Sequence, residues 1–461
     1  MSGHDDIQGN ILRGYASHRH ASYVFTEISD PGAARRLVAK LLPQIATERE
    51  WESRPASRIN LAFTYAGLGR LGVPLHPFAA FDDFRAGMYQ RARAQLGDLG
   101  ANDPDSWSAE LSHRAHALFT IYGRDEEIRA HEVARLRSEL PAGGMEVVYA
   151  QDADSLAGSR EHFGFRDGFS EPAITGISED RRSRRGEGAQ RPAWHRLFGD
   201  DWRGVRLGEF ILGRKDEDGV VPGHGDRVLR NGTFMVWRKL EQDVGAFEEW
   251  VQAQAGGDRT GAELLKARIV GRWPDGISLI RRPPGTGTAS RRRSVAGDPG
   301  AAPSATDRAQ INDFVYGGDP DGVRCPLGAH VRRSYPRDAL GYRTERTRRN
   351  RIIRRGMPYQ DREPPARGLI FVCFNASIAR QFEQIQGGWL MQGDTFGLGT
   401  DRDFLTGGLD HTGDTTRMTI QGDRARPPQF LIRDRQFVTV RGGYYLFVPG
   451  LEALRRMIEQ Q

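Results

Sequence analysis

Three segments of the chain combine residue types that could carry acid–base or redox chemistry. They are EHFGFRDGFSEPAITG (161–176), CPLGAHVRRSYPRD (325–338) and RRNRIIRRGMPYQ (348–360). Asp167 stands between aromatic residues and glycines, which suit either an ordinary Asp-Gly turn or close approach to a flat ligand. His330 follows two small residues, so a bulky group could reach its imidazole, although a lone histidine is more often structural. Arg354 either faces an anion or extends its charged end to solvent.

Together these residues offer an imidazole, an acid and a cation. A neutral imidazole can bind haem iron from one side. On the other side, an acid that moves a proton and a fixed positive charge assist cleavage of a peroxide O–O bond. Arginines beside His330 could pair with haem propionates through two parallel hydrogen bonds. The three segments therefore hold the minimum equipment of a haem peroxidase.

Other catalytic patterns are missing from the sequence. It contains no Walker loop, no HExxH, no GxSxG and no CxxC. Its two cysteines, Cys325 and Cys373, cannot build a four-thiolate metal site or a disulfide framework. Phosphate-loop nucleotide hydrolysis, zinc proteolysis and serine-hydrolase chemistry are therefore not indicated.

Composition places the chain among ordinary globular proteins. It has 461 residues, 38% of them hydrophobic and 27% charged, which excludes wholesale disorder. All but four of its 66 basic residues are arginine, and acidic residues alternate with them, so the net charge of +6 does not indicate nucleic-acid binding. No apolar run reaches the ~18 residues of a membrane helix. We see no secretory signal at the N-terminus, and we expect a cytoplasmic protein without a membrane partner.

The pattern of short strands and helices predicts an α+β fold. In the first half, strands are expected at 21–28, 59–67, 116–123 and 145–153, with helices at 31–45 and 125–140. In the second half, strands are expected at 232–240 and 368–375, a hairpin-like pair at 437–450, and helices at 243–255, 376–390 and 451–460. Each half reads as a ferredoxin-like unit, which indicates a pseudo-duplicated architecture. Residues 179–200 and 282–312 are predicted surface excursions; the role of the second is left open.

These three segments resemble the dye-decolourising peroxidase family. GFRDG matches its GxxDG signature, CPLGAHVRRSYPRD is similar to its proximal-histidine segment, and RIIRRGMPY is similar to its distal-arginine segment. Further similar stretches are DIQGNILRGY (6–15), GEFILG (208–213), NGTFMVWRKL (231–240), RGLIFVCFNASIARQFEQIQGGW (367–389) and DRDFLTGG (401–408). The resemblance is to the larger fungal-like and bacterial branch. Tyr335 and Gln360 depart from residues common in the family.

The resemblance implies a dimeric α+β barrel-type fold of two ferredoxin-like units, residues 1–200 and 201–461. One haem b would lie in the second unit, with the distal acid contributed by the first. His330 would be the axial iron ligand, and Asp167 and Arg354 the distal catalytic pair. The remaining site residues that it implies are Arg332 or Arg333 on a propionate, Leu369 and Phe371 lining the distal pocket, Asp403 bonded to His330, and Tyr359 and Trp389 as electron-transfer residues.

The implied activity is oxidation of organic reductants, including dyes and phenolics, by hydrogen peroxide through a ferryl intermediate. An ordinary aspartate pKa near ~4 predicts that acidic pH favours substrate oxidation. The alternative is a haem carrier, a haem sensor or an iron-releasing protein without turnover, which would need the ligand but not the distal pair. A cargo role inside a protein shell ranks lower. The protein is expected to be a monomer or a homodimer.

Overall fold

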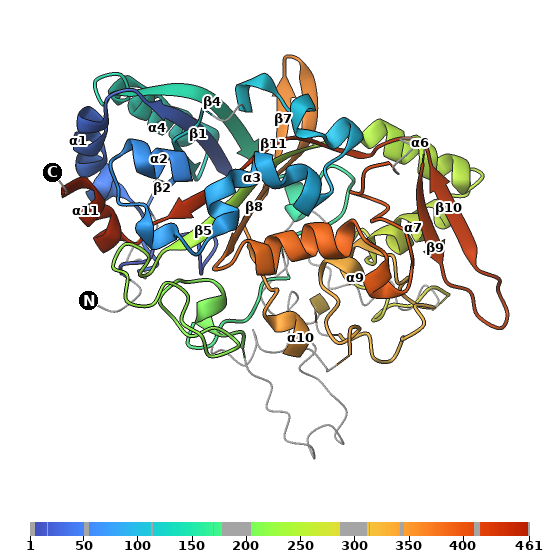
Figure 1. Ribbon diagram of the computed structural model, residues 1–461. Helices are drawn as coiled ribbons and strands as arrows, with labels where there is room; N and C mark the ends of the chain where they lie inside the picture. Colours follow the sequence, from blue (N-terminus) through green and yellow to red (C-terminus); the bar gives the residue numbers. More distant parts are fainter. Residues whose placement is uncertain are drawn as a thin grey trace.

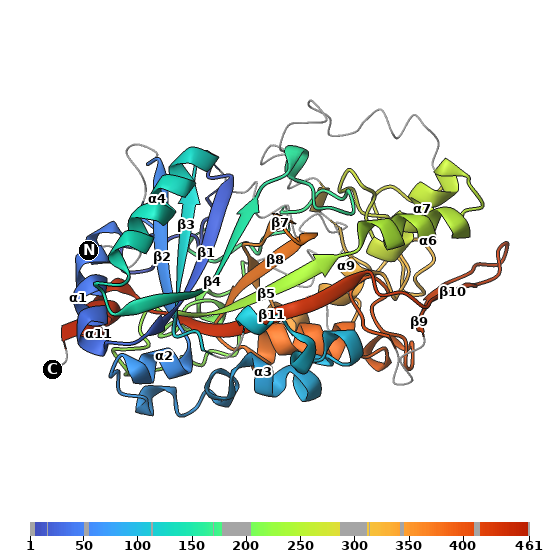
Figure 2. The same cartoon turned by 90° about the horizontal axis from the view of Figure 1, so that it is seen from above.

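Strands from both halves of the chain join in one sheet, shown in Figures 1 and 2. This computed structural model describes residues 5–459, apart from 16, 50–54, 112–113, 169, 178–203, 286–310, 313, 342–344 and 410–414. Most of the two predicted surface excursions, 179–200 and 282–312, therefore lies outside the described residues. The N- and C-termini lie at the same end of the molecule.

The described strands form a nine-stranded sheet and a separate two-stranded ribbon. The sheet order is β4-β1-β3-β2-β11-β5-β8-β6, and β7 pairs with β8. Its strands are β1 (His20–Ile28), β2 (Ser57–Phe63), β3 (Ala117–Gly123), β4 (Met145–Asp154), β5 (Thr233–Gln242), β6 (Ile353–Arg354), β7 (Met357–Arg362), β8 (Pro365–Asn375) and β11 (Val438–Val448). The ribbon consists of β9 (Thr416–Ile420) and β10 (Gln429–Arg433), and it projects at the end opposite the termini.

Two four-stranded groups are visible within the large sheet. The first half supplies β1 to β4, and the second half supplies β5, β6, β8 and β11 with β7 beside them. The two groups share a single residue pair, Phe63 opposite Phe447. At the other side β4 contacts β7, so the sheet curves around a shared apolar interior that contains Phe25, Trp237 and Ile370. This α+β barrel arrangement confirms the predicted fold class.

Helices cover the outer faces of the two groups. The α-helices are α1 (Pro31–Leu41), α2 (Tyr65–Arg70), α3 (Asp82–Leu96), α4 (Glu126–Glu139), α6 (Val244–Gln254), α7 (Arg259–Val270), α9 (His330–Ser334), α10 (Glu345–Arg348) and α11 (Leu451–Glu459). Short 3₁₀ turns are η1 (Leu42–Gln44), η2 (His76–Phe78), η3 (Gly100–Asn102), η4 (Pro104–Ser106), η5 (Ala109–Leu111), η6 (Ala157–Ser159), η9 (Leu207–Glu209) and η11 (Asp394–Phe396). None of the described helices has the length and apolarity that crossing a membrane requires.

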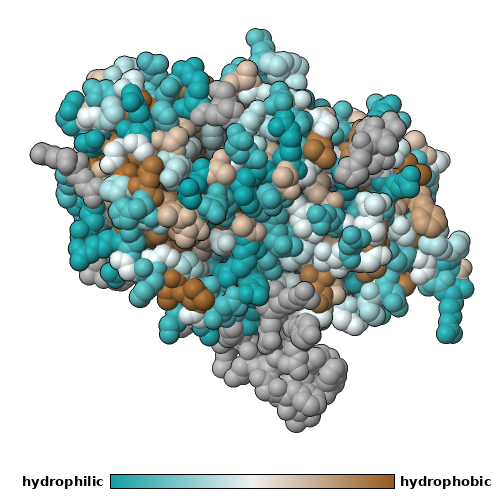
Figure 3. All heavy atoms as spheres, viewed as in Figure 1, coloured by the Kyte–Doolittle hydropathy of each residue, from teal (hydrophilic) through white to brown (hydrophobic). Residues whose placement is uncertain are grey.

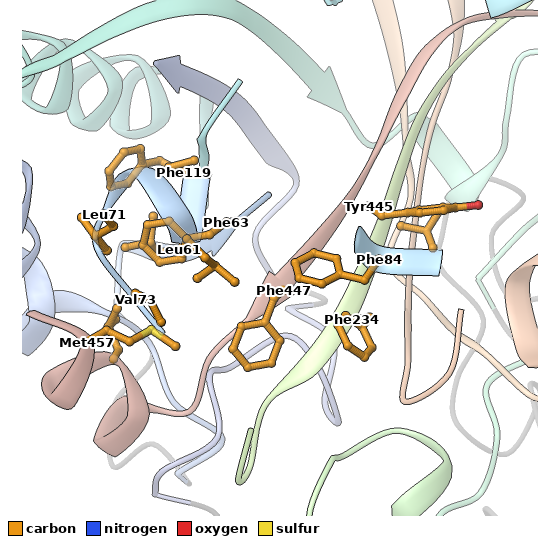
Figure 4. Packing of buried hydrophobic residues seen from close by; sticks show 14 of the residues in the cluster. Leu61, Phe63, Leu71, Val73, Phe84, Phe119, Phe234, Tyr445, Phe447 and Met457 are labelled. Atoms are coloured by element: carbon orange, nitrogen blue, oxygen red, sulfur yellow. The ribbon is translucent and has the colours of Figure 1, made fainter. Parts of the chain in front are cut away.

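Local sequence explains where several helices begin. Asp30 precedes α1, and its carboxylate accepts hydrogen bonds from the first free N–H groups, with Pro31 at the first helical position. Asp125 caps α4 in the same way. The apolar faces of the helices pack on the sheet around Phe63, Phe447 and their neighbours, as Figure 4 shows. On the face seen in Figure 3, the hydrophobic side chains are scattered among hydrophilic ones.

Two sequence-based expectations need correction. The predicted hairpin at 437–450 is wrong: β11 is one continuous strand with a register shift between Val440 and Gly442. The paired glycines do not turn the chain; a Cβ on Gly442 would lie 2.5 Å from Leu111, so glycine is needed for close packing. The helix predicted at 376–390 exists, but it is a π-helix, η10 (Ala379–Leu390).

Candidate active site

Asp167 and Arg354 form a two-pronged ion pair although 187 residues separate them in the chain. Arg354 Nη2 lies 2.8 Å from Asp167 Oδ1, and Nη1 lies 3.1 Å from Oδ2. Arg354 ends the short strand β6, and Asp167 stands in the loop after η6, where its N–H bonds the carbonyl of Ser159 at 2.8 Å. Parallel N–H···O bonds of this kind fix orientation as well as distance.

The loop that presents Asp167 is held by a half-buried carboxylate. Glu161 accepts hydrogen bonds from the N–H groups of Phe163 and Phe165, both at 2.9 Å, and from Gln242 Nε2 at 2.6 Å. Gly164 between them has φ of 92°, a conformation that a side chain would strain. The glycines of the sequence motif thus shape a tight loop that aims Asp167.

The electrostatics of this pair keep both members charged. Burial alone would raise the pKa of Asp167, but the charge and hydrogen bonds of Arg354 outweigh burial and hold this pKa below its ordinary value of 3.8. Asp167 in turn raises the pKa of Arg354. At neutral pH the site therefore contains a carboxylate that can accept a proton, next to a permanent positive charge.

His330 begins the short helix α9 and is oriented by a buried aspartate. Its Nδ1 lies 3.1 Å from Asp403 Oδ2, and Asp403 has no solvent exposure. The other oxygen of Asp403 accepts hydrogen bonds from Leu405 N, Thr406 N and Thr406 Oγ1, so the carboxylate is fixed in place. When Nδ1 donates to Asp403, the lone pair of Nε2 is left for a metal.

His330, Asp167 and Arg354 are surrounded by protein but keep part of their accessible surface. Their side chains keep 27%, 40% and 37% of their accessible surface. Burial is nevertheless the largest influence on the pKa of both His330 and Asp167, so protein surrounds them. Asp167 and Arg354 also shift the pKa of His330, which places all three within electrostatic reach of one another.

Leu369 and Phe371 lie on the same face of the sheet as Arg354. Arg354 stands directly opposite Cys373 in the register of β6 and β8, and directly opposed residues of antiparallel strands share a face. Because side chains alternate along a strand, Cys373, Phe371 and Leu369 all point to that face. Both Leu369 and Phe371 are partly exposed, whereas Ile370 between them is buried in the barrel interior.

The two arginines after His330 have acquired different partners. Arg332 donates to Asp319 Oδ2 at 3.1 Å and to the carbonyls of Cys325 and Asp319, both at 2.8 Å. Its charge is thus paired with Asp319 inside the protein, although its buried Nε has no hydrogen-bond partner among the described residues. The propionate role implied for it stays a prediction. Arg333 donates to three backbone carbonyls, and its buried Nη1 has no hydrogen-bond partner among the described residues.

A further buried arginine was missed in the sequence. Arg272 donates to Asn312 Oδ1 at 2.9 Å, and Arg337 donates to the same oxygen at 2.7 Å. Burial, with the nearby charge of Arg337, lowers the pKa of Arg272 to about 10. Arg272 also influences the pKa of Asp167, so it lies near the distal pair. Nothing in its sequence context distinguishes it in a chain so rich in arginine.

These features suit haem. Among the described residues no group of three His, Cys, Asp or Glu side chains could bind a bare metal ion. A single imidazole such as that of His330 can serve as the protein ligand of a haem iron. The buried Arg333 Nη1, which has no hydrogen-bond partner among the described residues, offers a donor that an anionic group would satisfy. A porphyrin with two propionates meets both conditions.

The two predicted electron-transfer residues lie on different elements of the fold. Tyr359 is on β7 and 1% exposed, with Lys239 Nζ 4.6 Å from its ring centre. Burial raises its pKa well above the ordinary value. Trp389 lies in η10 and is 4% exposed, and its carbonyl accepts a hydrogen bond from Arg333 Nε at 3.0 Å. Tyr359 therefore neighbours the distal strands, and Trp389 contacts the helix that carries His330.

Comparison with known proteins places this chain and its fold in one class, the peroxidases. Residues 6–155 match the family described as DyP dimeric alpha+beta barrel domain, and residues 306–397 match Dyp-type peroxidase, C-terminal. A dye-decolorizing peroxidase of Exidia glandulosa is 29% identical over 98% of this chain and 86% of its own length. The multifunctional dye peroxidase DyP2 of Amycolatopsis sp. is 26% identical over 98% of this chain and 95% of its own.

Solved structures agree with the sequence matches. An ancestral D-type dye-decolorizing peroxidase superposes with a TM-score of 0.80 at 27% identity, covering 99% of both chains. A dye-decolorizing peroxidase in complex with 2,6-dimethoxyphenol gives a TM-score of 0.77 at 26% identity, covering 98% of this chain and 99% of the other. This chain belongs to the dye-decolourising peroxidase family.

Proposed function

We propose that this peroxidase holds one haem b per chain through His330 and uses Asp167 and Arg354 to activate hydrogen peroxide for the oxidation of phenols and dyes. One observation supports this most strongly. Asp167 and Arg354 form a two-pronged ion pair, and the charges of both influence the pKa of His330. A haem carrier would need only the histidine, so the distal ion pair favours the enzyme.

The cofactor-binding residues in this proposal each have a distinct task. His330 presents Nε2 to the iron while Asp403 fixes the tautomer and ring orientation through Nδ1. Leu369 and Phe371 supply an apolar wall that keeps bulk water from the distal side. Arg333, through its unpartnered Nη1, is the candidate for a propionate contact. Bound haem supplies the redox-active iron.

In the distal pair, Asp167 transfers the proton and Arg354 stabilises negative charge. Asp167 is ionised at neutral pH because Arg354 lowers its pKa, so a carboxylate oxygen can accept the proton of one peroxide oxygen. Delivery of that proton to the other peroxide oxygen lets this second oxygen leave as water. Arg354 keeps its positive charge throughout and stabilises negative charge on the departing oxygen.

Bulky reductants are proposed to give up electrons at a distance from the iron. Tyr359 and Trp389 are the candidate relay residues, and each is an oxidisable aromatic residue beside an element of the site. If Tyr359→Phe and Trp389→Phe leave dye turnover unchanged while the reaction with peroxide stays normal, this relay is wrong.

The two ferredoxin-like units are proposed to be residues 1–200 and 201–461, with haem in the second and Asp167 contributed by the first. The single residue pair between β2 and β11 supports two units. A cytoplasmic location and a monomeric or homodimeric state stay predictions.

The proposed function is tested with haem-loaded protein, hydrogen peroxide and 2,6-dimethoxyphenol. Wild type should oxidise the phenol, and His330→Ala should lose the haem absorbance band and turnover together. His131→Ala, which replaces an exposed histidine on α4, is the matched control and should behave like wild type. Full haem retention and turnover in His330→Ala would contradict the proposal.

A further inference from the structure

The residue that follows the distal arginine directs its side chain to the other face of the sheet. Arg355 N donates to Val372 O at 2.7 Å, so the strand pairing of β6 continues through Arg355. Because neighbouring strand residues point to opposite faces, Arg355 points away from the face on which Arg354 lies. It is only 8% exposed. A guanidinium buried on this face needs several acceptors to offset the loss of water.

Arg355 finds those acceptors on three different segments. Its Nη1 donates to Glu171 Oε1 at 2.9 Å and to the carbonyl of Arg354 at 2.8 Å. Its Nε donates to the carbonyl of Asn10 at 2.8 Å, and its Nη2 donates to that of Ile11 at 3.1 Å. One side chain thus connects β6, the loop that continues from Asp167, and the start of the chain.

The start of the chain is a firm support. We call residues 6–15 the N-terminal strap. Gln8 donates to Leu61 O at 2.8 Å and accepts from Leu61 N at 3.0 Å, which ties the strap to β2. Glu48, which is buried, accepts from Leu12 N at 2.7 Å. A Cβ on Gly14 would lie 3.4 Å from Arg355 Nε, so strap and guanidinium are in close contact.

Two ion pairs therefore join the same two segments. Asp167 and Glu171 stand four residues apart on one loop, and Arg354 and Arg355 are consecutive at the end of β6. The first pair lies on the face that Arg354 shares with Leu369 and Phe371, and the second lies on the opposite face against the N-terminal strap. Movement of the loop relative to β6 would stretch both pairs at once.

We propose that Arg355 and Glu171 are positioning residues for the peroxide step, which hold the loop and β6 in register against the N-terminal strap. This rests on the catalytic role proposed above for Asp167 and Arg354. Neither Arg355 nor Glu171 touches the reacting atoms; they keep Asp167 and Arg354 at a productive separation. Misplacement of catalytic groups by about 1 Å costs roughly 100-fold in rate.

The test compares Glu171→Gln, Glu171→Ala and Arg355→Lys with wild type as haem-loaded proteins. Glu171 is half-exposed, so its variants are expected to fold. The second-order rate constant with hydrogen peroxide should fall roughly 10- to 100-fold in Glu171→Ala, less in Glu171→Gln, while haem content and KM for the phenol stay unchanged. Arg355→Lys should retain part of the rate, because an ammonium still donates to some of these acceptors.

Amide hydrogen exchange gives a readout that is independent of activity. The N–H of Asp167, bonded to Ser159 O, should exchange faster in Glu171→Ala than in wild type. Glu249→Gln is the matched control, since Glu249, like Glu171, is exposed and pairs with one arginine, Arg435, at 3.1 Å. This control should change neither the peroxide rate nor the exchange of Asp167.

Including Asp167→Asn distinguishes failure of the positioning role from failure of the proposed function. Suppose that Asp167→Asn reacts more slowly with peroxide than wild type, while the Glu171 variants react within threefold of the wild-type rate and the N–H of Asp167 exchanges as in wild type. This result would overturn the positioning role alone. An Asp167→Asn variant as fast as wild type would remove both the positioning role and the proposed function.

Discussion

Glu48 offers a test of the N-terminal strap through its effect on stability. The side chain is 6% exposed and accepts hydrogen bonds from the backbone of Leu12 and Arg13. Burial raises its pKa from 4.5 to about 7, although these N–H groups and the charge of Arg355 act in the opposite direction. The folded protein therefore binds a proton at Glu48 over a pH range in which the unfolded chain has lost it.

The sign and size of the effect follow from this shift. A group whose pKa is higher in the folded state stabilises the fold fully below its unfolded pKa, and that contribution is lost as pH rises through the folded pKa. The shift of Glu48 is about 2.5 pH units, and each unit corresponds to about 1.4 kcal/mol. Ionised Glu48 thus costs about 3 kcal/mol above pH 7, of which about 2 kcal/mol develops between pH 5.5 and 8.5.

Replacement by glutamine isolates this contribution, because the amide oxygen can still accept from Leu12 and Arg13 but does not ionise. The free energy of unfolding is measured in urea at pH 5.5 and 8.5 for wild type, Glu48→Gln and the control Glu249→Gln. Relative to wild type, Glu48→Gln should gain about 2 kcal/mol on going from pH 5.5 to 8.5. Equal pH dependence of wild type and Glu48→Gln, within about 0.5 kcal/mol, would refute the reasoning.

Three further predictions concern the site and the core. Asp403→Asn removes the carboxylate that bonds His330 Nδ1, and the haem dissociation rate should rise about 10- to 100-fold. An unchanged dissociation rate would exclude the orienting role of Asp403. Asp98→Ala leaves the guanidinium of Arg238 buried without its 2.6 Å partner and should cost about 3–5 kcal/mol in urea unfolding, whereas a cost below about 1 kcal/mol would contradict it. Because the pKa of Asp167 is lowered, Asp167 stays ionised in mild acid, and the rate constant with hydrogen peroxide should stay level from pH 8 to pH 5 and fall only below pH 3.8. Stopped-flow rate constants that decline already at pH 6 would contradict this prediction.

Strong local patterns made much of the fold predictable. The helix expected at 125–140 is α4 (Glu126–Glu139), because an aspartate cap and an acidic first turn specify its start. The strand expected at 232–240 is β5 (Thr233–Gln242). The continuity of β11 was not predictable, because the close packing that requires Gly442 comes from Leu111, far away in the sequence. Similarly, nothing local separates the π-helix η10 from an ordinary amphipathic helix.

The site shows the same division between local pattern and tertiary contact. Motif resemblance singled out His330, Asp167 and Arg354, and the structure brings Asp167 and Arg354 into direct contact. The partners of Arg332 could not be foreseen, because its pairing with Asp319 depends on how the turn before α9 folds back. Arg355 is likewise indistinguishable from Arg354 in sequence until the strand assigns them to opposite faces.

The most direct test of the proposed mechanism is the rate at which haem-loaded protein reacts with one equivalent of hydrogen peroxide, followed by stopped-flow absorbance in wild type, Asp167→Asn, Arg354→Leu and the double variant. We predict that each single variant is slower by roughly 100-fold or more, and that the double variant is little slower than the worse single one, because the two residues act as a unit. Single variants that react within threefold of the wild-type rate would contradict the account.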